Sequence, residues 1–314
     1  MPAPTMDQAI TAATPYGGPN EPSYSGVTSF MRRKYTKDLA GADVAITGVP
    51  LDLATTGRPG ARFGPRGLRA ASANIAWGKP FPWGFDPFET IAAIDYGDCF
   101  FDMGHPGAFA EAIEAHTRTI VQAGVVPLTL GGDHFVTYPV LKAVAEKHGP
   151  LSLIHFDAHS DTWAEEDKRL DHGTMFYWAA KEGLVDPAHS VQVGLRTWND
   201  ETHGYNILTA PWIHEYGIEA AVSEIRARVG TRPVYITFDI DCLDPAFAPG
   251  TGTPVPGGLS SAQALGIVRG LTKLAYTGFD LVEVAPPYDH AEMTALAGAQ
   301  IALEYLCLMA DARR

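Results

Sequence analysis

Two short segments of the chain place acidic and imidazole side chains at alternating positions. Asp157, His159 and Asp161 lie two residues apart, and Asp239 and Asp241 repeat the spacing. Alternate residues of a β-strand share a face, so we expect each set to point in one direction. Four carboxylates at one place would repel one another and would be costly to desolvate. Because two divalent cations would balance the four negative charges, the pattern predicts a binuclear metal site.

Two histidines can complete the two metal positions. His134 closes the run Gly-Gly-Asp-His, and His159 lies between the first two aspartates. Ligation that is mostly by oxygen favours manganese or a similar hard ion over zinc. A single aspartate after a strand often only caps a turn. Two clusters with the same spacing are hard to explain in that way.

Several other polar residues near these segments have two interpretations. His172 is either a loop histidine or a group that moves protons near neutral pH. Glu283 is a lone acid in an apolar strand and needs a partner. Asp133 could orient the His134 ring or cap a helix. We assign His155 to the core or to a position behind the ligands, because the ligand set is complete without it. We interpret Cys242 as a packing residue, because water activated by metal ions would leave no need for a thiol nucleophile.

The elements that must position these residues follow from the apolar pattern. Short apolar runs alternate with helical stretches, which predicts a parallel sheet covered by helices on both faces. The polar segments fall at the carboxyl ends of strands, where ligands bind in such sheets. Predicted strands span 43–50, 90–98, 125–133, 151–161, 190–196, 233–241 and 279–284, and predicted helices span 107–123, 138–148, 217–229, 261–274 and 292–310.

Composition limits the class of protein and its partners. The chain has 314 residues, 46% of them hydrophobic and 19% charged, as in globular proteins. A net charge of −13 argues against a nucleic-acid or anionic-membrane partner and favours a small cationic one. Three scattered cysteines suit a reducing compartment. The first residues do not have the pattern of a secretory signal, so we expect a cytoplasmic protein.

The longer motifs resemble a known family. The runs GGDHF, HFDAHSDT and TFDIDCLDPAFAPGTGTPVPGGL are similar to signature segments of the ureohydrolase (arginase/agmatinase) family, most of all to bacterial agmatinases. The similarity continues through TGVPLDLATTGRPGARFGP, DHGTMFYWAAKEGL and DLVEVAPPYD, over residues 40–305. It implies a three-layer α/β/α fold with an eight-stranded, mostly parallel sheet, assembled as homotrimers or homohexamers. We therefore expect an N-terminal arm over 1–40 and one catalytic domain over 41–314.

The resemblance also implies roles for individual residues. Asp157, Asp161 and one of the pair Asp239 and Asp241 would bridge the ions. Asp161 would also stabilise the tetrahedral intermediate, His172 would shuttle protons and Glu283 would bind the substrate guanidinium. The two manganese ions would be held by His134, Asp157, His159, Asp161, Asp239 and Asp241.

The implied reaction is hydrolysis of agmatine to putrescine and urea. The segment after Asp161 contains Trp163 and three consecutive acids that begin at Glu165, which would favour an ammonium tail over a carboxylate. Lys168 and Arg169 could instead pair with a carboxylate. Guanidinobutyrase, arginase and an inactive polyamine-binding or regulatory subunit therefore remain alternatives.

Overall fold

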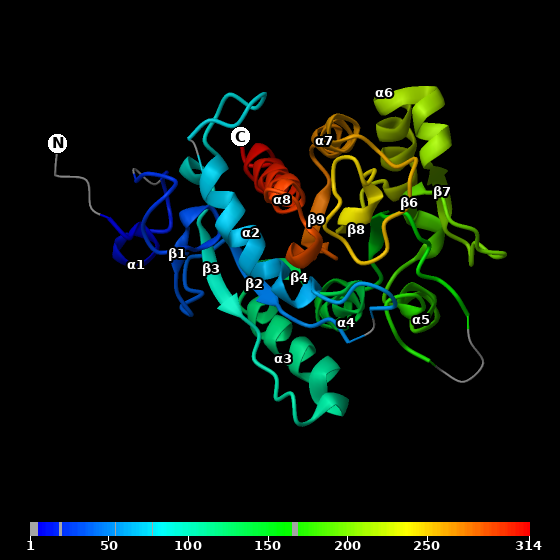
Figure 1. Cartoon of the computed structure of the whole chain (residues 1–314), viewed down its shortest axis with the longest axis horizontal. Coiled ribbons are helices and arrows are strands. Elements are labelled where there is room, and N and C mark those ends of the chain that lie inside the picture. The colour runs from blue at the N-terminus through cyan, green and yellow to red at the C-terminus, as the bar shows by residue number, and fades with distance from the viewer. Residues whose placement is uncertain (1–5, 19–20, 54, 77, 165–168) are drawn as a thin grey trace.

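A single parallel sheet forms the centre of the protein. The computed structural model describes residues 6–18, 21–53, 55–76, 78–164 and 169–314 (Figure 1). Within these ranges nine strands pair in the order β1-β3-β2-β4-β9-β8-β5-β6-β7, and neighbours run parallel. The strands are β1 (Lys34–Tyr35), β2 (Val44–Val49), β3 (Ala93–Asp98), β4 (Val126–Gly131), β5 (Ser152–Phe156), β6 (Val191–Leu195), β7 (Asn206–Thr209), β8 (Pro233–Asp239) and β9 (Ala275–Val282).

Helices cover both faces of the sheet (Figure 1). One core cluster joins α2, α6, α7 and α8 to the sheet, and a second joins α3, α4 and α5 to it. The predicted three-layer α/β/α fold is therefore confirmed, with nine strands in place of eight among the described residues. The helices are α1 (Gln8–Thr11), α2 (Gly64–Ser72), α3 (Phe109–Gln122), α4 (Thr137–His148), α5 (Met175–Lys181), α6 (Ala210–Val229), α7 (Ser261–Gly270) and α8 (Met293–Asp311).

The seven predicted strands are all present, and the two further strands lie at the edges of the sheet. β1 has two residues and pairs with β3, while β7 is only partly buried and pairs with β6. Strands this short carry no readable alternation of apolar and polar residues. The segment 151–161 was predicted to be one long strand, but β5 ends at Phe156.

The C-terminal helix α8 belongs to the interior. Its length and composition would allow it to cross a membrane, yet 78% of its most apolar window is buried inside the protein. Leu303, Leu306 and Ala310 are among its residues with almost no exposed surface. Its apolar character is that of a core helix that packs on the sheet.

Part of the N-terminal segment is built into the sheet. Phe30 and Met31 are buried, and the Phe30 backbone N–H donates to Asp95 Oδ2 at 2.7 Å. The guanidinium of Arg69, on α2, binds the same carboxylate at 2.8 and 3.0 Å. These contacts attach residues 30–35 to the edge of the sheet, so this part of the expected arm packs on its own chain.

The connections create a crevice over the four central strands. The chain leaves β4 towards α4 and β5 towards α5, which lie on one face. It leaves β8 towards α7 and β9 towards α8, which lie on the other face. Where the connections that follow two adjacent strands lead to opposite faces, as for β4 and β9 and for β8 and β5, the carboxyl ends of the strands are left open as a binding crevice.

Candidate metal centre

The crevice collects the acidic and imidazole residues that the spacing singled out. His134 follows β4, the segment Asp157–Asp161 follows β5, and Asp239 is the last residue of β8. The predicted strand geometry for the first segment is wrong, because these residues lie in the loop beyond β5. Asp161 there has a φ of 51°, a left-handed backbone conformation that is uncommon outside glycine and that turns its side chain back towards the crevice.

His134 faces three carboxylates. Its Nδ1 atom lies 3.0 Å from Asp157 Oδ2, 3.1 Å from Asp161 Oδ2 and 3.3 Å from Asp239 Oδ2. This nitrogen is buried, and none of the described residues makes a hydrogen bond to it in acceptable geometry. One N–H could in any case serve only one of these oxygens. A nitrogen lone pair and three carboxylate oxygens around one point form a donor set suited to a divalent cation.

A second group lies beside the first and shares one residue with it. Nδ1 of His159 is 3.2 Å from Asp157 Oδ1 and 3.2 Å from Asp241 Oδ2. Asp157 thus turns one carboxylate oxygen to each histidine. A shared carboxylate between two imidazole-bearing groups is the arrangement expected for two neighbouring ions.

Three of the four carboxylates resist ionisation in the metal-free protein, whereas the neighbouring histidines outweigh burial and hold the pKa of Asp157 well below its usual range. Burial, together with the neighbouring charges of Asp241 and Asp157, holds the pKa of Asp239 well above its usual range. Burial and the charge of Asp157 also raise the pKa values of Asp161 and Asp241. Bound divalent cations would remove this penalty, so the charges as well as the donor atoms fit a pair of metal ions.

His155 lies close to the centre but has no lone pair to offer it. Gln192 Nε2 donates to His155 Nδ1 at 3.0 Å and to the Ser160 carbonyl oxygen at 2.6 Å. The proton of His155 must then reside on Nε2, which lies 2.7 Å from Asp157 Oδ2. His155 therefore donates a hydrogen bond to the candidate ligand Asp157 and is not itself a ligand.

Loops from other parts of the chain hold Asp241. Its Oδ1 accepts from the Ala158 N–H at 3.1 Å, and its Oδ2 accepts from the Thr253 hydroxyl at 3.1 Å. Arg196 donates to the Asp241 carbonyl oxygen at 2.6 Å and to the Val255 carbonyl oxygen at 2.7 Å. Arg196 and Thr253 were not predicted from the sequence, since neither lies in a motif with the ligand spacing.

Asp133 does not take the capping role that its position suggested. Its side chain makes no capping hydrogen bond to the helical turn that begins at His134. The outer nitrogen of the His134 ring, Nε2, lies 2.8 Å from the Thr237 hydroxyl instead. Thr237 is therefore the residue that contacts the outer nitrogen of His134.

A cavity of about 200 Å³ opens onto the centre. Its lining includes the candidate ligands Asp161, Asp239 and His159 together with Trp163 and His172. Trp163 is held by a hydrogen bond from its backbone N–H to the Gly173 carbonyl oxygen at 3.0 Å, and its ring lies 6.4 Å from that of His159. Two of the residues expected to meet substrate therefore face the same space as the candidate ligands.

Glu283 is buried next to this cavity, although it does not line it. Its Oε1 accepts from the His134 backbone N–H at 2.9 Å and lies 3.6 Å from His172 Nδ1. A Cβ atom at Gly252 would lie only 3.3 Å from the other oxygen, Oε2. Glu283 has a φ of 62°, so a second polar residue of this region has a backbone conformation that is uncommon outside glycine.

The electrostatic environment of His172 favours a charged imidazole. Burial opposes the charge, but the carboxylates of Glu283 and Asp161 outweigh it and raise the pKa of His172 to about 9. His172 is therefore protonated at neutral pH in the metal-free protein. A cationic imidazole beside a buried carboxylate can both donate a proton and hold Glu283 in place.

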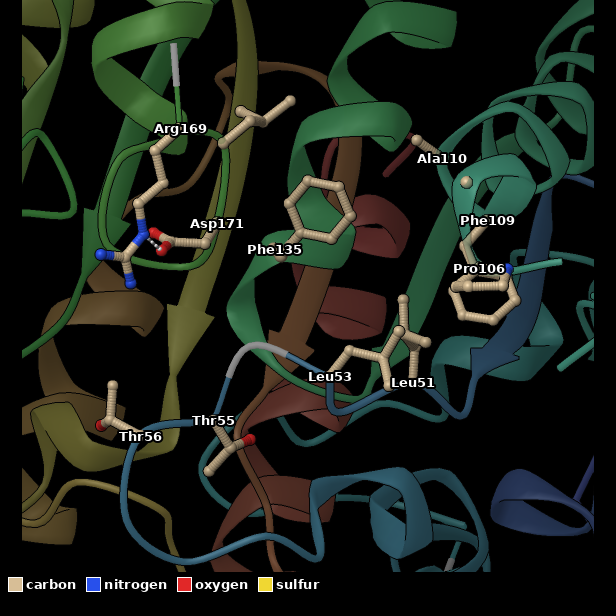
Figure 2. A pocket seen from close by; sticks show the side chains of 12 residues that line it. Leu51, Leu53, Thr55, Thr56, Pro106, Phe109, Ala110, Phe135, Arg169 and Asp171 are labelled. Atoms are coloured by element: carbon tan, nitrogen blue, oxygen red, sulfur yellow. Dashed lines mark hydrogen bonds and ion pairs between the residues drawn. The ribbon is translucent and has the colours of Figure 1, made fainter. Parts of the chain in front are cut away.

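A larger cavity of about 640 Å³ adjoins the first, and Thr56 lines both. Figure 2 shows the Arg169 guanidinium and the Asp171 carboxylate facing each other on one side, with Leu51 and Phe135 among the apolar side chains elsewhere in the wall. This larger cavity, which we call the outer cavity, thus has mainly apolar walls and one ion pair. Glu165, which was expected to bind substrate, lies outside the described residues.

An α/β sheet that brings carboxylates and imidazoles to the ends of its central strands has the architecture of a metallohydrolase. The sequence profile of the arginase family matches residues 42–307, and the chain belongs to that family. An agmatinase of Chromobacterium violaceum is 58% identical over 96% of this chain and 95% of its own length.

Two solved structures resemble the whole fold. A hypothetical agmatinase from Burkholderia thailandensis is 60% identical, with a TM-score of 0.96 over 97% of this chain and 98% of that one. The proclavaminate amidino hydrolase of Streptomyces clavuligerus is 41% identical, with a TM-score of 0.89 over 93% of this chain and 100% of that one. The resemblance seen in the motifs is therefore confirmed along nearly the entire chain.

Proposed function

We propose that this protein is an agmatinase, which hydrolyses agmatine to putrescine and urea with the aid of two manganese ions. The observation that carries the proposal is the pair of donor groups around His134 and His159, joined by Asp157. The identity of more than half of the residues to relatives named agmatinase supports the substrate.

Six residues would hold the ions. His134, Asp161 and Asp239 would bind one, His159 and Asp241 the other, and Asp157 would bridge them. When bound, the two cations would lower the pKa of water, so that hydroxide is available to attack the guanidinium carbon near neutral pH. Manganese suits the four carboxylates of this set better than zinc does.

Glu283 would orient the guanidinium. Its carboxylate is fixed by the His134 N–H at 2.9 Å and is almost excluded from water, with 2% of the residue exposed. A buried carboxylate forms strong, directional hydrogen bonds to a guanidinium. Asp161, which lines the cavity, would accept a hydrogen bond from the tetrahedral centre that forms there.

His172 would move protons. Glu283, which lies beside its ring, favours the protonated imidazole, and that form can deliver its proton to the departing amine. The neutral ring could then take a proton from the next water. Its place on the cavity wall, beside Glu283, is the location that this role requires.

The far end of the substrate would lie towards Trp163 and the outer cavity. The ring of Trp163 can face an ammonium group through a cation–π contact. Arg169, which could have bound a carboxylate tail, forms an ion pair with Asp171. This compensation of its charge favours agmatine over 4-guanidinobutyrate. Glu165 remains a proposed partner of the ammonium.

The proposal includes a cellular setting. We infer one catalytic domain over 41–314 and a 1–40 arm whose residues 30–35 pack on that domain's sheet, acting in the cytoplasm as a homotrimer or homohexamer without a nucleic-acid or membrane partner. The net charge of −13 suits a cationic substrate. The three cysteines are buried free thiols, as a reducing compartment would leave them.

The test is urea release by the manganese-loaded full chain with agmatine, arginine and 4-guanidinobutyrate. We expect kcat/KM to be highest for agmatine. Asp241→Asn should abolish turnover, while the matched control Asp38→Asn, at an exposed aspartate near the sheet edge, should leave it unchanged. Preference for another substrate would overturn the proposed specificity alone. No turnover of any of the three would support the alternative of an inactive polyamine-binding or regulatory subunit.

A further inference from the structure

Four neighbouring strands each carry one polar side chain at the same level of the sheet. Gln192 on β6 pairs with His155 on β5, His155 with Thr237 on β8, and Thr237 with Asp280 on β9. All four residues have 0% of their surface exposed, and their strands are otherwise mostly apolar. We call Gln192, His155, Thr237 and Asp280 the polar row. Placing it in the interior costs free energy, so it calls for a reason.

The polar row lies directly beneath the candidate metal ligands. His155 precedes Asp157 by two residues, and Thr237 precedes Asp239 by two residues. Because side chains alternate along a strand, Thr237 and Asp239 share a face of β8. Asp157 lies just beyond β5, and its Oδ2 lies 2.7 Å from Nε2 of His155 on the same side. This face is the one covered by α4 and α5, since Asp280 accepts from the Thr137 hydroxyl of α4 at 2.9 Å and His155 packs against Phe176 of α5.

Hydroxyl groups surround the carboxylate of Asp280. Its Oδ2 lies 2.7 Å from the Tyr235 hydroxyl and 2.9 Å from that of Thr137, and its Oδ1 lies 2.5 Å from that of Thr237. Burial raises the pKa of Asp280, while the neighbouring His134 and the three hydroxyl groups favour its ionised form. An ionised carboxylate can only accept, so each hydroxyl directs its single hydrogen to Asp280. The hydrogen of Thr237 is thereby committed.

This commitment determines the state of His134. Its Nε2 atom lies 2.8 Å from the Thr237 oxygen, which has already given its hydrogen to Asp280. Nε2 must then be the donor and must carry the ring proton. In the neutral imidazole the other nitrogen, Nδ1, is left with a lone pair, and Nδ1 is the atom that faces Asp157, Asp161 and Asp239.

We propose that Thr237 and Asp280 are positioning residues that fix the proton of His134 on Nε2 and so keep its Nδ1 lone pair directed at the metal. This inference rests on the proposed metal centre, because Thr237 and Asp280 would support His134, one of its ligands. It predicts a selective effect. Loss of the Thr237 hydroxyl should weaken the ion held by the His134 group and spare the ion held by His159 and Asp241. Partners of metal-bound histidines typically contribute a factor of about 10–100 in metal affinity.

The chain offers a matched control. Thr129 on β4 pairs with Asp280 in register, on the side opposite Thr237, and is equally buried. Its hydroxyl has no hydrogen-bond partner in the part of the chain that the structure describes. Thr129→Val and Thr237→Val therefore make the same chemical change at the same level of the sheet, and only the second removes a contact to His134.

The experiment is a titration of the metal-free full chain with Mn²⁺, in which electron paramagnetic resonance reports free and bound ions. We expect Thr237→Val to bind one ion as tightly as the unchanged protein and the other roughly 10–100-fold more weakly. Thr237→Ser, which keeps the hydroxyl, should restore both affinities, and Thr129→Val should retain them. If Thr237→Val does not fold, Asp280→Asn, which retains the shape but not the charge, should weaken the same ion.

The outcomes separate this inference from the metal centre itself. If the unchanged protein fails to bind two ions, the proposed centre is wrong. If it binds two and Thr237→Val binds both with unchanged affinity, the centre stands and the positioning role is wrong. Equal weakening of both ions, or equal effects of Thr237→Val and Thr129→Val, would indicate a general packing role and would also overturn the inference.

Discussion

Replacement of Glu283 by Gln isolates the charge that should bind the guanidinium. The amide oxygen can still accept from the His134 N–H, now at 2.9 Å, so the backbone and the metal ligands should keep their places. The remaining oxygen would become an NH₂ group, which cannot accept from a guanidinium. Hydrogen bonds to a buried charge contribute about 1.5–3 kcal/mol each. Loss of one or two, with partial compensation by water, should raise the barrier by about 2–4 kcal/mol.

That increase in the activation barrier corresponds to a fall in kcat/KM for agmatine of roughly 30- to 1,000-fold. The assay is urea release at subsaturating agmatine, together with a count of bound manganese, which should stay at the value of the unchanged protein. Glu304→Gln is a matched control, because Glu304 is a buried carboxylate that binds Trp83 and Arg269 away from the centre. Unchanged kcat/KM, or loss of metal in Glu283→Gln, would refute the assigned role.

Three further predictions follow from individual contacts. His172→Phe should keep its manganese but lower kcat by on the order of 10²–10⁴-fold, whereas loss of metal would make His172 a ligand. Arg69→Met leaves the buried Asp95 carboxylate without its cation and should reduce the free energy of unfolding by about 3–5 kcal/mol in urea denaturation; a change below 1 kcal/mol would contradict this. Burial and the charge of Lys37 lower the pKa of His116 to about 4, below its usual 6.5. As pH falls, the unfolded chain therefore binds a proton at this histidine before the folded chain does. The free energy of unfolding should then decrease as pH falls from 6.5 towards 4. His116→Asn should make Tm less sensitive to acid over that range, and an unchanged pH profile of Tm would argue against this origin.

The fold was largely readable because each buried strand is a short apolar run bounded by turn residues. The α/β/α layers follow from the alternation of such runs with helices. β1 could not be predicted, since Lys34 and Tyr35 become a strand only through their pairing with Ile94 and Asp95. The helix α2 was not predicted. Its sequence begins with Gly64 and Pro65, although proline suits the first turn of a helix.

The candidate ligands were found for a reason that is only partly correct. Their spacing suggested one strand face, whereas Asp161 reaches the centre through a left-handed backbone conformation in a loop. The polar row was missed for a different reason. A lone polar residue in an apolar strand, such as Thr237 or Asp280, is visible in the sequence. That the two are neighbours depends on strand register, which the sequence does not reveal.

The central claim is that six side chains hold two ions that share Asp157. Crystals of the manganese-loaded protein, measured at a wavelength where manganese scatters anomalously, test it most directly. We expect two peaks, one beside His134 Nδ1 and the other beside His159 Nδ1, with the Asp157 carboxylate between them. A single peak, no peak, or a peak bound to His155 in place of either histidine would contradict it.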